Sequence, residues 1–244
     1  MAAFSLFLNF LYPPRCFACG MRFGAAEERR VCDACIARVE RMPEPQCNIC
    51  SGPLESVVSG ESRCARCAAV RPHYRKARTI ARYRTSAEDQ PGTLPALIRR
   101  HKYGLDQSAG RAIAEYLGDR LPVSSADYDL IVSVPLHWRR LWWRGFNQAT
   151  LLAEEVARRL QLPLDAVSFA RRRSTTSQTA RDHDERIRNV RRAFVVLYPE
   201  RIRGHRILLI DDVMTTGATV NECARTLIAG GAVSVDVFTL ARVL

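Results

Sequence analysis

The chain of 244 residues contains almost no lysine and no long apolar segment. Of its 37 basic residues, only Lys76 and Lys102 are lysines, and the arginines are spread along the whole chain, which indicates a bias of composition. Residues 2–12 are the one candidate for a targeting or membrane segment, but they are too short to span a bilayer and lack the basic leading region of a signal peptide. We therefore predict a cytoplasmic protein without a membrane span. We expect residues 2–12 to form a packed helix, with membrane attachment as the alternative.

Cysteine is absent between residues 68 and 222, whereas eight of the nine cysteines form four Cys-x-x-Cys pairs near the N-terminus. The pairs are Cys16 and Cys19, Cys32 and Cys35, Cys47 and Cys50, and Cys64 and Cys67. Two such pairs supply the four thiolates of a structural zinc ion, so we predict two zinc ribbons that fold around two Zn²⁺. The alternatives are iron–sulfur ligation, whose ferredoxin spacings four evenly repeated pairs do not match, and a redox dithiol. Pairing in sequential order is the simpler arrangement, and a cross-braced arrangement remains open.

The formal charge of +12 falls to about +8 when eight thiolates and two Zn²⁺ are counted. The excess of positive charge is unevenly distributed along the chain, because residues 171–206 carry eleven arginines against four acidic residues. Such a segment is most often a solvated surface, but it can also attract pyrophosphate or nucleic acid.

The most informative run of residues is 207–219. An apolar strand at 207–210 leads to Asp211 and Asp212, and small or hydroxylated residues follow before a helix at 220–228. Backbone N–H groups at the start of that helix suit a phosphate, and two carboxylates suit the hydroxyl groups of a diol. We therefore predict a site for a sugar 5′-phosphate. The alternative is an acidic pair that only ends a strand or holds Mg²⁺.

Strand and helix patterns alternate after residue 73, which predicts an α/β fold with a doubly wound, mainly parallel sheet. Expected strands lie at 79–83, 129–134 and 233–240, and expected helices lie at 94–103, 110–121 and 148–160. We place the domain boundary at residue 72, between an N-terminal helix with a double zinc ribbon (1–72) and the α/β domain (73–244).

Two loops carry further candidates. The first, at 135–148, interleaves three arginines with three tryptophans: Arg139, Arg140, Arg144, Trp138, Trp142 and Trp143. The guanidinium groups of arginines donate pairs of hydrogen bonds to phosphate oxygens, and tryptophan rings can stack on unpaired bases. The alternative is a solvated turn whose tryptophans pack on the zinc ribbons. The second loop, at 174–186, is long and polar enough to form a lid.

The run 207–219 resembles the signature of the phosphoribosyltransferase fold, whose members bind phosphoribosyl pyrophosphate (PRPP). Together with the cysteine pairs, further motifs extend the likeness along the whole chain to the ComF family. They are His-Lys-Tyr-Gly at 101–104, Val-Pro-Leu at 134–136, Arg-Gly-Phe-Asn-Gln at 144–148, Gln178, Arg-Asn-Val at 188–190 and Phe194. The resemblance implies a sheet of phosphoribosyltransferase type with a small N-terminal double zinc-ribbon module.

The resemblance also implies which residues bind PRPP with Mg²⁺. They are Asp211, Asp212, Thr215, Thr216, Gly217, Ala218, Thr219, Arg139 and Arg140. It further implies a bacterial protein of natural transformation, with single-stranded DNA and DNA-uptake proteins as partners. The other hypothesis is an active phosphoribosyltransferase of nucleotide metabolism. Thr215 argues against a purine-salvage enzyme, because 6-oxopurine enzymes have an aspartate base at that position and threonine is no base at neutral pH. No catalytic residue is assigned.

Overall fold

The computed structural model describes residues 13–24, 27, 29–55, 62–83, 117, 121–173 and 188–244. These residues belong to two compact units. One contains residues 13–40 and Leu117, and the other contains Arg41–Tyr83 and Leu121–Leu244. The boundary predicted at residue 72 does not coincide with this grouping, and it stays a prediction about which segments fold independently. The helices expected at 2–12 and 94–103, most of that expected at 110–121, and the loop at 174–186 lie outside the described residues.

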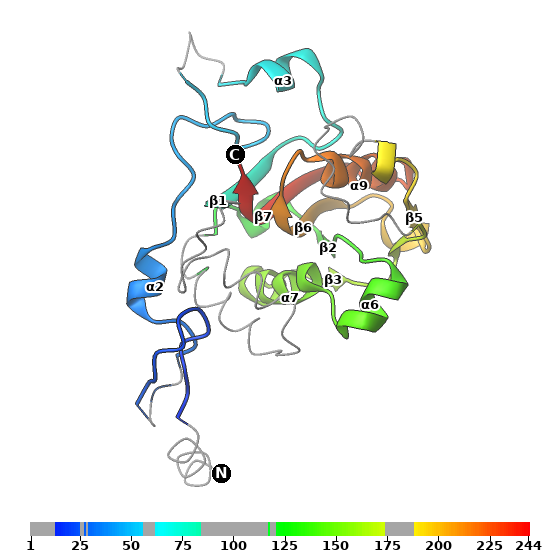
Figure 1. Ribbon diagram of the computed structural model, residues 1–244. Coiled ribbons are helices and arrows are strands. Elements are labelled where there is room, and N and C mark those ends of the chain that lie inside the picture. Colours follow the sequence, from blue (N-terminus) through cyan, green and yellow to red (C-terminus); the bar gives the residue numbers. More distant parts are fainter. Residues whose placement is uncertain are drawn as a thin grey trace. The chain divides into compact units, whose positions relative to one another are not determined.

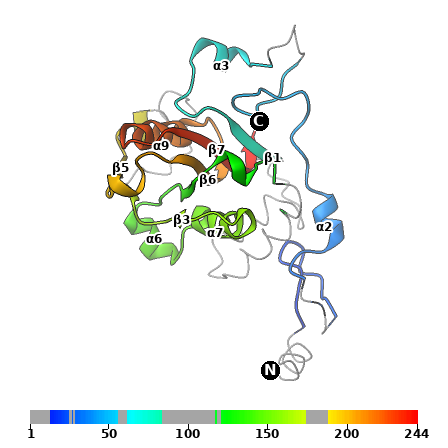
Figure 2. The ribbon, with the colours of Figure 1, turned by 180° about the vertical axis from the view of Figure 1, so that it is seen from behind.

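The larger unit contains a five-stranded parallel sheet, as the alternation of helix and strand predicted. The strand order is β1 (Ala77–Tyr83), β7 (Ser234–Val243), β6 (Arg206–Met214), β2 (Leu130–Ser133) and β3 (Leu164–Asp165). Helix α7 (Gln148–Leu160) lies on one face and helix α9 (Ala218–Ala229) on the other (Figure 1). The view from behind shows the same two layers around the sheet (Figure 2). The crossovers diverge between β2 and β6, which is the topological switch point where open α/β sheets bind ligands.

The central elements follow directly from the residue pattern. Residues 207–210 of β6 are fully buried, as expected for a strand that is covered on both faces. Helix α7 has the predicted bounds. It begins after Asn147, whose side chain accepts a hydrogen bond from the N–H group of Ala149, and it ends at Gln161, which adopts the left-handed conformation.

One helix lies where the sequence predicted only a loop. Helix α6 (Trp138–Arg144) begins after His137, whose ring nitrogen accepts a hydrogen bond from the N–H group of Arg139, and it ends at Gly145 with φ of 76°. The other short elements are α2 (Asp33–Ala37), α3 (Ala65–Ala69), the 3-10 helices η1 (Ser125–Asp127) and η2 (Pro199–Arg201), and the antiparallel strands β4 (Phe169–Arg171) and β5 (Phe194–Val196). No helix of the described segments has the length and apolarity to cross a bilayer.

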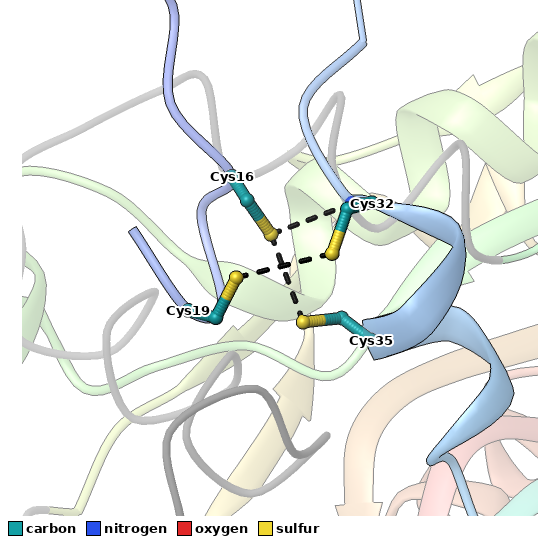
Figure 3. A group of neighbouring side chains, drawn as sticks. All are labelled: Cys16, Cys19, Cys32 and Cys35. Carbon is teal, nitrogen blue, oxygen red and sulfur yellow. Dashed lines mark hydrogen bonds between the residues drawn. The ribbon is translucent and has the colours of Figure 1, made fainter. Parts of the chain in front are cut away.

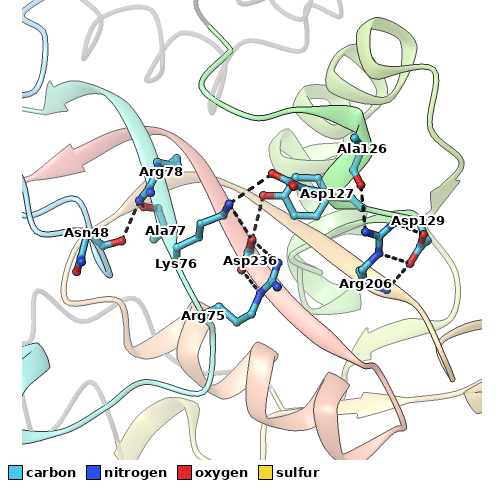
Figure 4. A network of polar contacts seen from close by, with 11 residues as sticks. Asn48, Arg75, Lys76, Ala77, Arg78, Ala126, Asp127, Asp129, Arg206 and Asp236 are labelled. Carbon is cyan, nitrogen blue, oxygen red and sulfur yellow. Dashed lines mark hydrogen bonds and ion pairs between the residues drawn. The ribbon is translucent and has the colours of Figure 1, made fainter.

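A polar network joins the amino-terminal ends of the strands, at the edge of the sheet opposite the carboxyl ends of the strands (Figure 4). Asp236 of β7 is 1% exposed and accepts two hydrogen bonds of 3.0 Å from Arg75. The Tyr128 hydroxyl donates a third, also of 3.0 Å, and burial followed by the charge of Asp236 raises the pKa of that hydroxyl. Nearby, Asp129 forms a bidentate pair with Arg206 of β6, which lowers the pKa of Asp129. The network ties β7, β6 and the entry to β2 together.

The two cysteine ribbons repeat one backbone pattern. In the first, the N–H group of Cys16 donates to the carbonyl of Met21, and Phe23 donates to Pro14. In the second, 31 residues further on, Cys47 donates to Gly52 and Leu54 donates to Pro45. The sequence suggested two similar units in tandem, and the structure confirms it.

The second ribbon lies along β1, at one edge of the sheet. The N–H group of Met42 donates to the carbonyl of Ile80, and the N–H group of Ala77 donates to the carbonyl of Ile49. Its cysteines belong to the same apolar cluster as the sheet residues beneath α9. The second ribbon therefore shares the core of the α/β fold.

Candidate functional site

The acidic pair lies where β6 extends beyond its neighbour β2. The sequence predicted that the strand ends before Asp211, but β6 continues to Met214. Pairing with β2 stops at Ser133 and Ile210, so Asp211 and Asp212 lie on a part of β6 that pairs only with β7. Both side chains are partly buried. Their carboxylates are therefore at the switch point, where a ligand can reach them.

The expected phosphate loop follows at once. Residues 215–217 join β6 to α9, and Gly217 precedes the helix with φ of 78°, a left-handed conformation that favours glycine. The Thr216 hydroxyl accepts a hydrogen bond of 3.3 Å from the N–H group of Ala218. Helix α9 begins two residues earlier than predicted. Its first N–H groups and its dipole provide a place for an anion.

The arginines that follow β2 separate into two settings. Arg139 is exposed and its guanidinium lies 5.3 Å from the ring centroid of Trp138. Arg140 instead lies near Arg171 of β4, which the sequence pattern did not single out. Burial lowers the pKa of Arg171, and the charge of Arg140 lowers it further, whereas Cys223 and Asp211 act in the opposite direction. The structure therefore brings Arg140, Arg171 and Asp211 into one electrostatic neighbourhood.

The tryptophans of α6 are not part of a packed core. The exposed fractions of Trp138, Trp142 and Trp143 are 63%, 86% and 68%. Trp138 and Leu141 line a cavity of about 700 Å³ that also reaches Phe146 at the turn before α7. In the larger unit these rings are therefore exposed and do not pack against the second ribbon.

The eight paired cysteines form two groups of four, and within each group the Sγ atoms lie within 4.8 Å of one another. The groups combine the pairs in sequential order, so the cross-braced alternative does not occur. In the first group, shown in Figure 3, the distances from Cys16 Sγ to Cys35 Sγ and from Cys19 Sγ to Cys32 Sγ are both 3.8 Å. A tetrahedron with Zn–S bonds of about 2.3 Å has edges of about 3.8 Å. Both groups therefore fit structural Zn²⁺.

The backbone around the first cysteine of each ribbon favours a thiolate. Burial raises the pKa of Cys16, but N–H groups of Cys32, Cys19 and Ala18 outweigh it and lower the pKa to about 7. The equivalent Cys47 also has its pKa lowered to about 7, by the same kind of backbone contacts. Cys223 is fully buried and belongs to neither group, as predicted for a small apolar residue.

Comparisons with known proteins find two types of domain in the chain. Residues 7–71 match the double zinc ribbon domain, and residues 147–243 match the phosphoribosyl transferase domain. A parallel sheet with an acidic pair and the loop 215–217 at its switch point, together with two four-cysteine sites, defines a phosphoribosyltransferase-type protein with an N-terminal double zinc ribbon.

The similarity to full-length relatives is more specific. The DNA utilization protein YhgH of Escherichia coli (strain K12) is 32% identical over 237 residues, which is 95% of this chain and 98% of that protein. Competence protein F of Haemophilus influenzae is 28% identical, covering 97% of this chain and 98% of the relative. Competence protein ComFC of Bacillus subtilis is 29% identical, covering 88% and 85%. The chain belongs to the ComF family.

Proposed function

We propose that this chain is a cytoplasmic protein of DNA uptake that binds a PRPP-type phosphosugar with Mg²⁺ and also binds single-stranded DNA. The observation that carries the proposal is the joining of an acidic pair and a phosphate loop at the switch point of the sheet. The names of the relatives, DNA utilization protein and competence protein, support the link to DNA. Partner proteins of the uptake machinery remain part of this proposal.

The phosphosugar half of the proposal follows from the geometry of one sheet edge. The 5′-phosphate would accept hydrogen bonds from the backbone N–H groups of residues 215–219, and the ribose hydroxyls would donate to Asp211 and Asp212. A pyrophosphate group beside them would meet Arg140 and Arg171, which share the neighbourhood of Asp211. Mg²⁺ would neutralise the charge between carboxylates and pyrophosphate. Arg139 suits this role less, because its guanidinium lies over Trp138.

The DNA half of the proposal rests on helix α6. Exposed tryptophans offer flat apolar faces, and arginines on the same helix offer charge for phosphates. The adjoining cavity of about 700 Å³ is lined by Trp138, Phe146 and Arg172, so an unstacked base and its phosphate would find suitable groups together. Such a surface binds with little preference for sequence.

Calorimetry with PRPP, with and without Mg²⁺, tests the phosphosugar site. Asp212→Asn should weaken binding about 10- to 100-fold, because a charge-assisted hydrogen bond contributes roughly 1.5–3 kcal/mol. The matched control is Asp127→Asn, which removes an exposed carboxylate at the other end of the strands and should change nothing. Equal effects of the two substitutions, or no binding by the unmodified protein, would refute this half. Release of pyrophosphate on adding a base or DNA would instead reveal an active transferase.

Fluorescence anisotropy with a labelled oligonucleotide tests the DNA surface. Changing Arg139, Arg140 and Arg144 together to alanine should weaken binding and reduce the salt slope by up to about 0.7 for each phosphate that the protein no longer neutralises. Exposed Arg201 and Arg203, changed to alanine together, control for the loss of two of the three charges. An unchanged slope in the triple variant would remove α6 from the DNA path. Competition between PRPP and DNA would show whether the two ligands share one anion-binding surface.

A further inference from the structure

Helix α3 of the second ribbon contacts the phosphate loop directly. Arg66 lies between the third and fourth cysteines of its zinc site, Cys64 and Cys67, and a guanidinium N–H group of Arg66 donates to the carbonyl of Thr216. The same guanidinium reaches to 3.6 Å from the position that a Cβ atom would take on Gly217. The side chain therefore touches the two residues at the centre of the loop.

Residues just after α3 form a second connection. The N–H group of His73 donates to the Asn221 side chain over 2.7 Å, and Asn221 in turn donates from its backbone to the Gly217 carbonyl over 2.9 Å. Tyr74 is 4% exposed, and its hydroxyl lies 3.7 Å from the Cβ position of Gly217. Tyr74 shares an apolar cluster with cysteines of the second zinc site and with Val220 of α9.

Apart from these contacts, a groove separates helix α3 from helix α9. A groove of about 560 Å³ is lined by Arg66 and Val70 on one side and by Ala218 and Glu222 on the other. The helices are therefore joined here by a few specific contacts and not by continuous side-chain packing. Helix α3 has only five residues, too few to be stable alone, so its position depends on Cys64 immediately before it and Cys67 within it.

The hydrogen bond from Arg66 has a consequence for the opposite side of the loop. The carbonyl of Thr216 and the N–H group of Gly217 belong to one planar trans peptide, in which they point in opposite directions. A donor that holds the carbonyl from behind therefore turns the Gly217 N–H group to the other side of the loop. An anion bound on that side would meet a donor that is already oriented, so its binding would carry no entropic cost for ordering that donor.

We infer that the second zinc site is a structural support of the phosphate loop, and that Arg66 is the positioning residue that connects them. The inference rests on the proposed role of residues 215–219 in binding a phosphate. Zinc at Cys47, Cys50, Cys64 and Cys67 holds α3, α3 places Arg66, and Arg66 orients the peptide between Thr216 and Gly217. Loss of the second zinc ion then weakens phosphosugar binding, and loss of the first does not.

Arg66→Gln tests the connection without removing a zinc ligand. This variant should still bind two zinc ions per chain and melt at the same temperature as the unmodified protein, yet its affinity for PRPP should fall about tenfold. Hydrogen–deuterium exchange of the peptide covering 214–225 should be faster in this variant, with no ligand present. Arg66→Lys, which keeps a cationic donor, should recover part of the affinity. The control Arg71→Gln changes an exposed arginine of the same segment and should alter neither measurement.

Two cysteine variants test the role of the metal. Cys64 and Cys32 occupy the same position, immediately before α3 and α2. Cys64→Ser should lose one zinc ion, speed exchange of the 214–225 peptide and weaken PRPP, whereas Cys32→Ser should lose one zinc ion and leave both properties unchanged.

The two proposals fail in different ways. Unchanged exchange and unchanged affinity in Arg66→Gln would overturn the inference, and so would equal effects of the two cysteine variants. An unmodified protein that does not bind PRPP, while Arg66→Gln still speeds exchange of the loop, would refute the ligand and leave the structural support standing.

Discussion

Replacing Asp236 with alanine removes the carboxylate at the centre of the network in Figure 4. This carboxylate is 1% exposed, accepts hydrogen bonds from Arg75 and Tyr128, and lies 3.7 Å from the ammonium group of Lys76. After the substitution, the buried Tyr128 hydroxyl loses its acceptor. The Arg75 side chain, which is 51% exposed, can turn to water. The cost therefore falls mainly on the buried hydroxyl and on the place that the carboxylate leaves.

The expected destabilisation is about 3 kcal/mol, the lower end of the 3–5 kcal/mol typical for breaking a buried ion pair, because the arginine partner can be hydrated again. For a unit of this size, each kcal/mol lowers the melting temperature by roughly 2–4 °C, so a decrease of about 6–12 °C is expected. Asp127→Ala removes a 49% exposed partner of Lys76 and should cost less than about 1 kcal/mol.

Thermal and urea unfolding of the zinc-loaded proteins, followed by circular dichroism, measures both variants. Asp236→Asn, which keeps an acceptor for Tyr128 but loses the charge, should fall between the alanine variant and the unmodified protein. If Asp236→Ala is no less stable than Asp127→Ala, the buried network does not stabilise the amino-terminal end of the sheet, and the reasoning is refuted. PRPP binding by folded Asp236→Ala should be unchanged, because the acidic pair lies at the opposite end of the strands.

The remaining predictions concern acid and metal. Burial alone would raise the pKa of Glu222, but Arg225 and the N–H group of Arg192 hold it below the usual 4.5. The stability from this depressed pKa is present above about pH 4.5 and is lost as pH falls through the lowered value, so the difference in melting temperature between the unmodified protein and Glu222→Gln should be constant from pH 7 to 5 and decrease as pH falls further. A difference that does not decrease below about pH 4.5 would contradict this. Elemental analysis should find two zinc ions per chain and one in Cys16→Ser, and an iron–sulfur absorbance band would exclude zinc.

The parts of the fold that could be predicted are those in which local pattern and burial agree. Helix α7 has the predicted bounds because its apolar residues recur at helical spacing between a capping asparagine and a left-handed C-cap. The buried half of β6 and the helix after it were evident for the same reason. The cysteine spacing also predicted both four-cysteine groups, because each pair needs only a short turn to present two thiolates.

Helix α6 was missed because its exposed tryptophans give it no apolar stripe facing a core, and the signals at its ends, His137 and Gly145, are weak alone. The extension of β6 past Asp211 depends on pairing with β7, which local sequence does not show. The contribution of Arg66 depends on a hydrogen bond across 150 positions of the chain. Since the spacing of cysteines is nearly the same in both ribbons, nothing local distinguishes the ribbon that shares the sheet's core.

The segment 41–54 also has a protective effect on the sheet. Among the described strands, β1 pairs only with β7 and forms an edge of the sheet, and edge strands with unpaired N–H and carbonyl groups invite pairing with other chains. Here the hydrogen bonds of Ile80 and Ala77 to the second ribbon use part of that edge. Depletion of zinc from the second site would uncover it, so the metal-poor protein should self-associate in a concentration-dependent way through exposed β-structure.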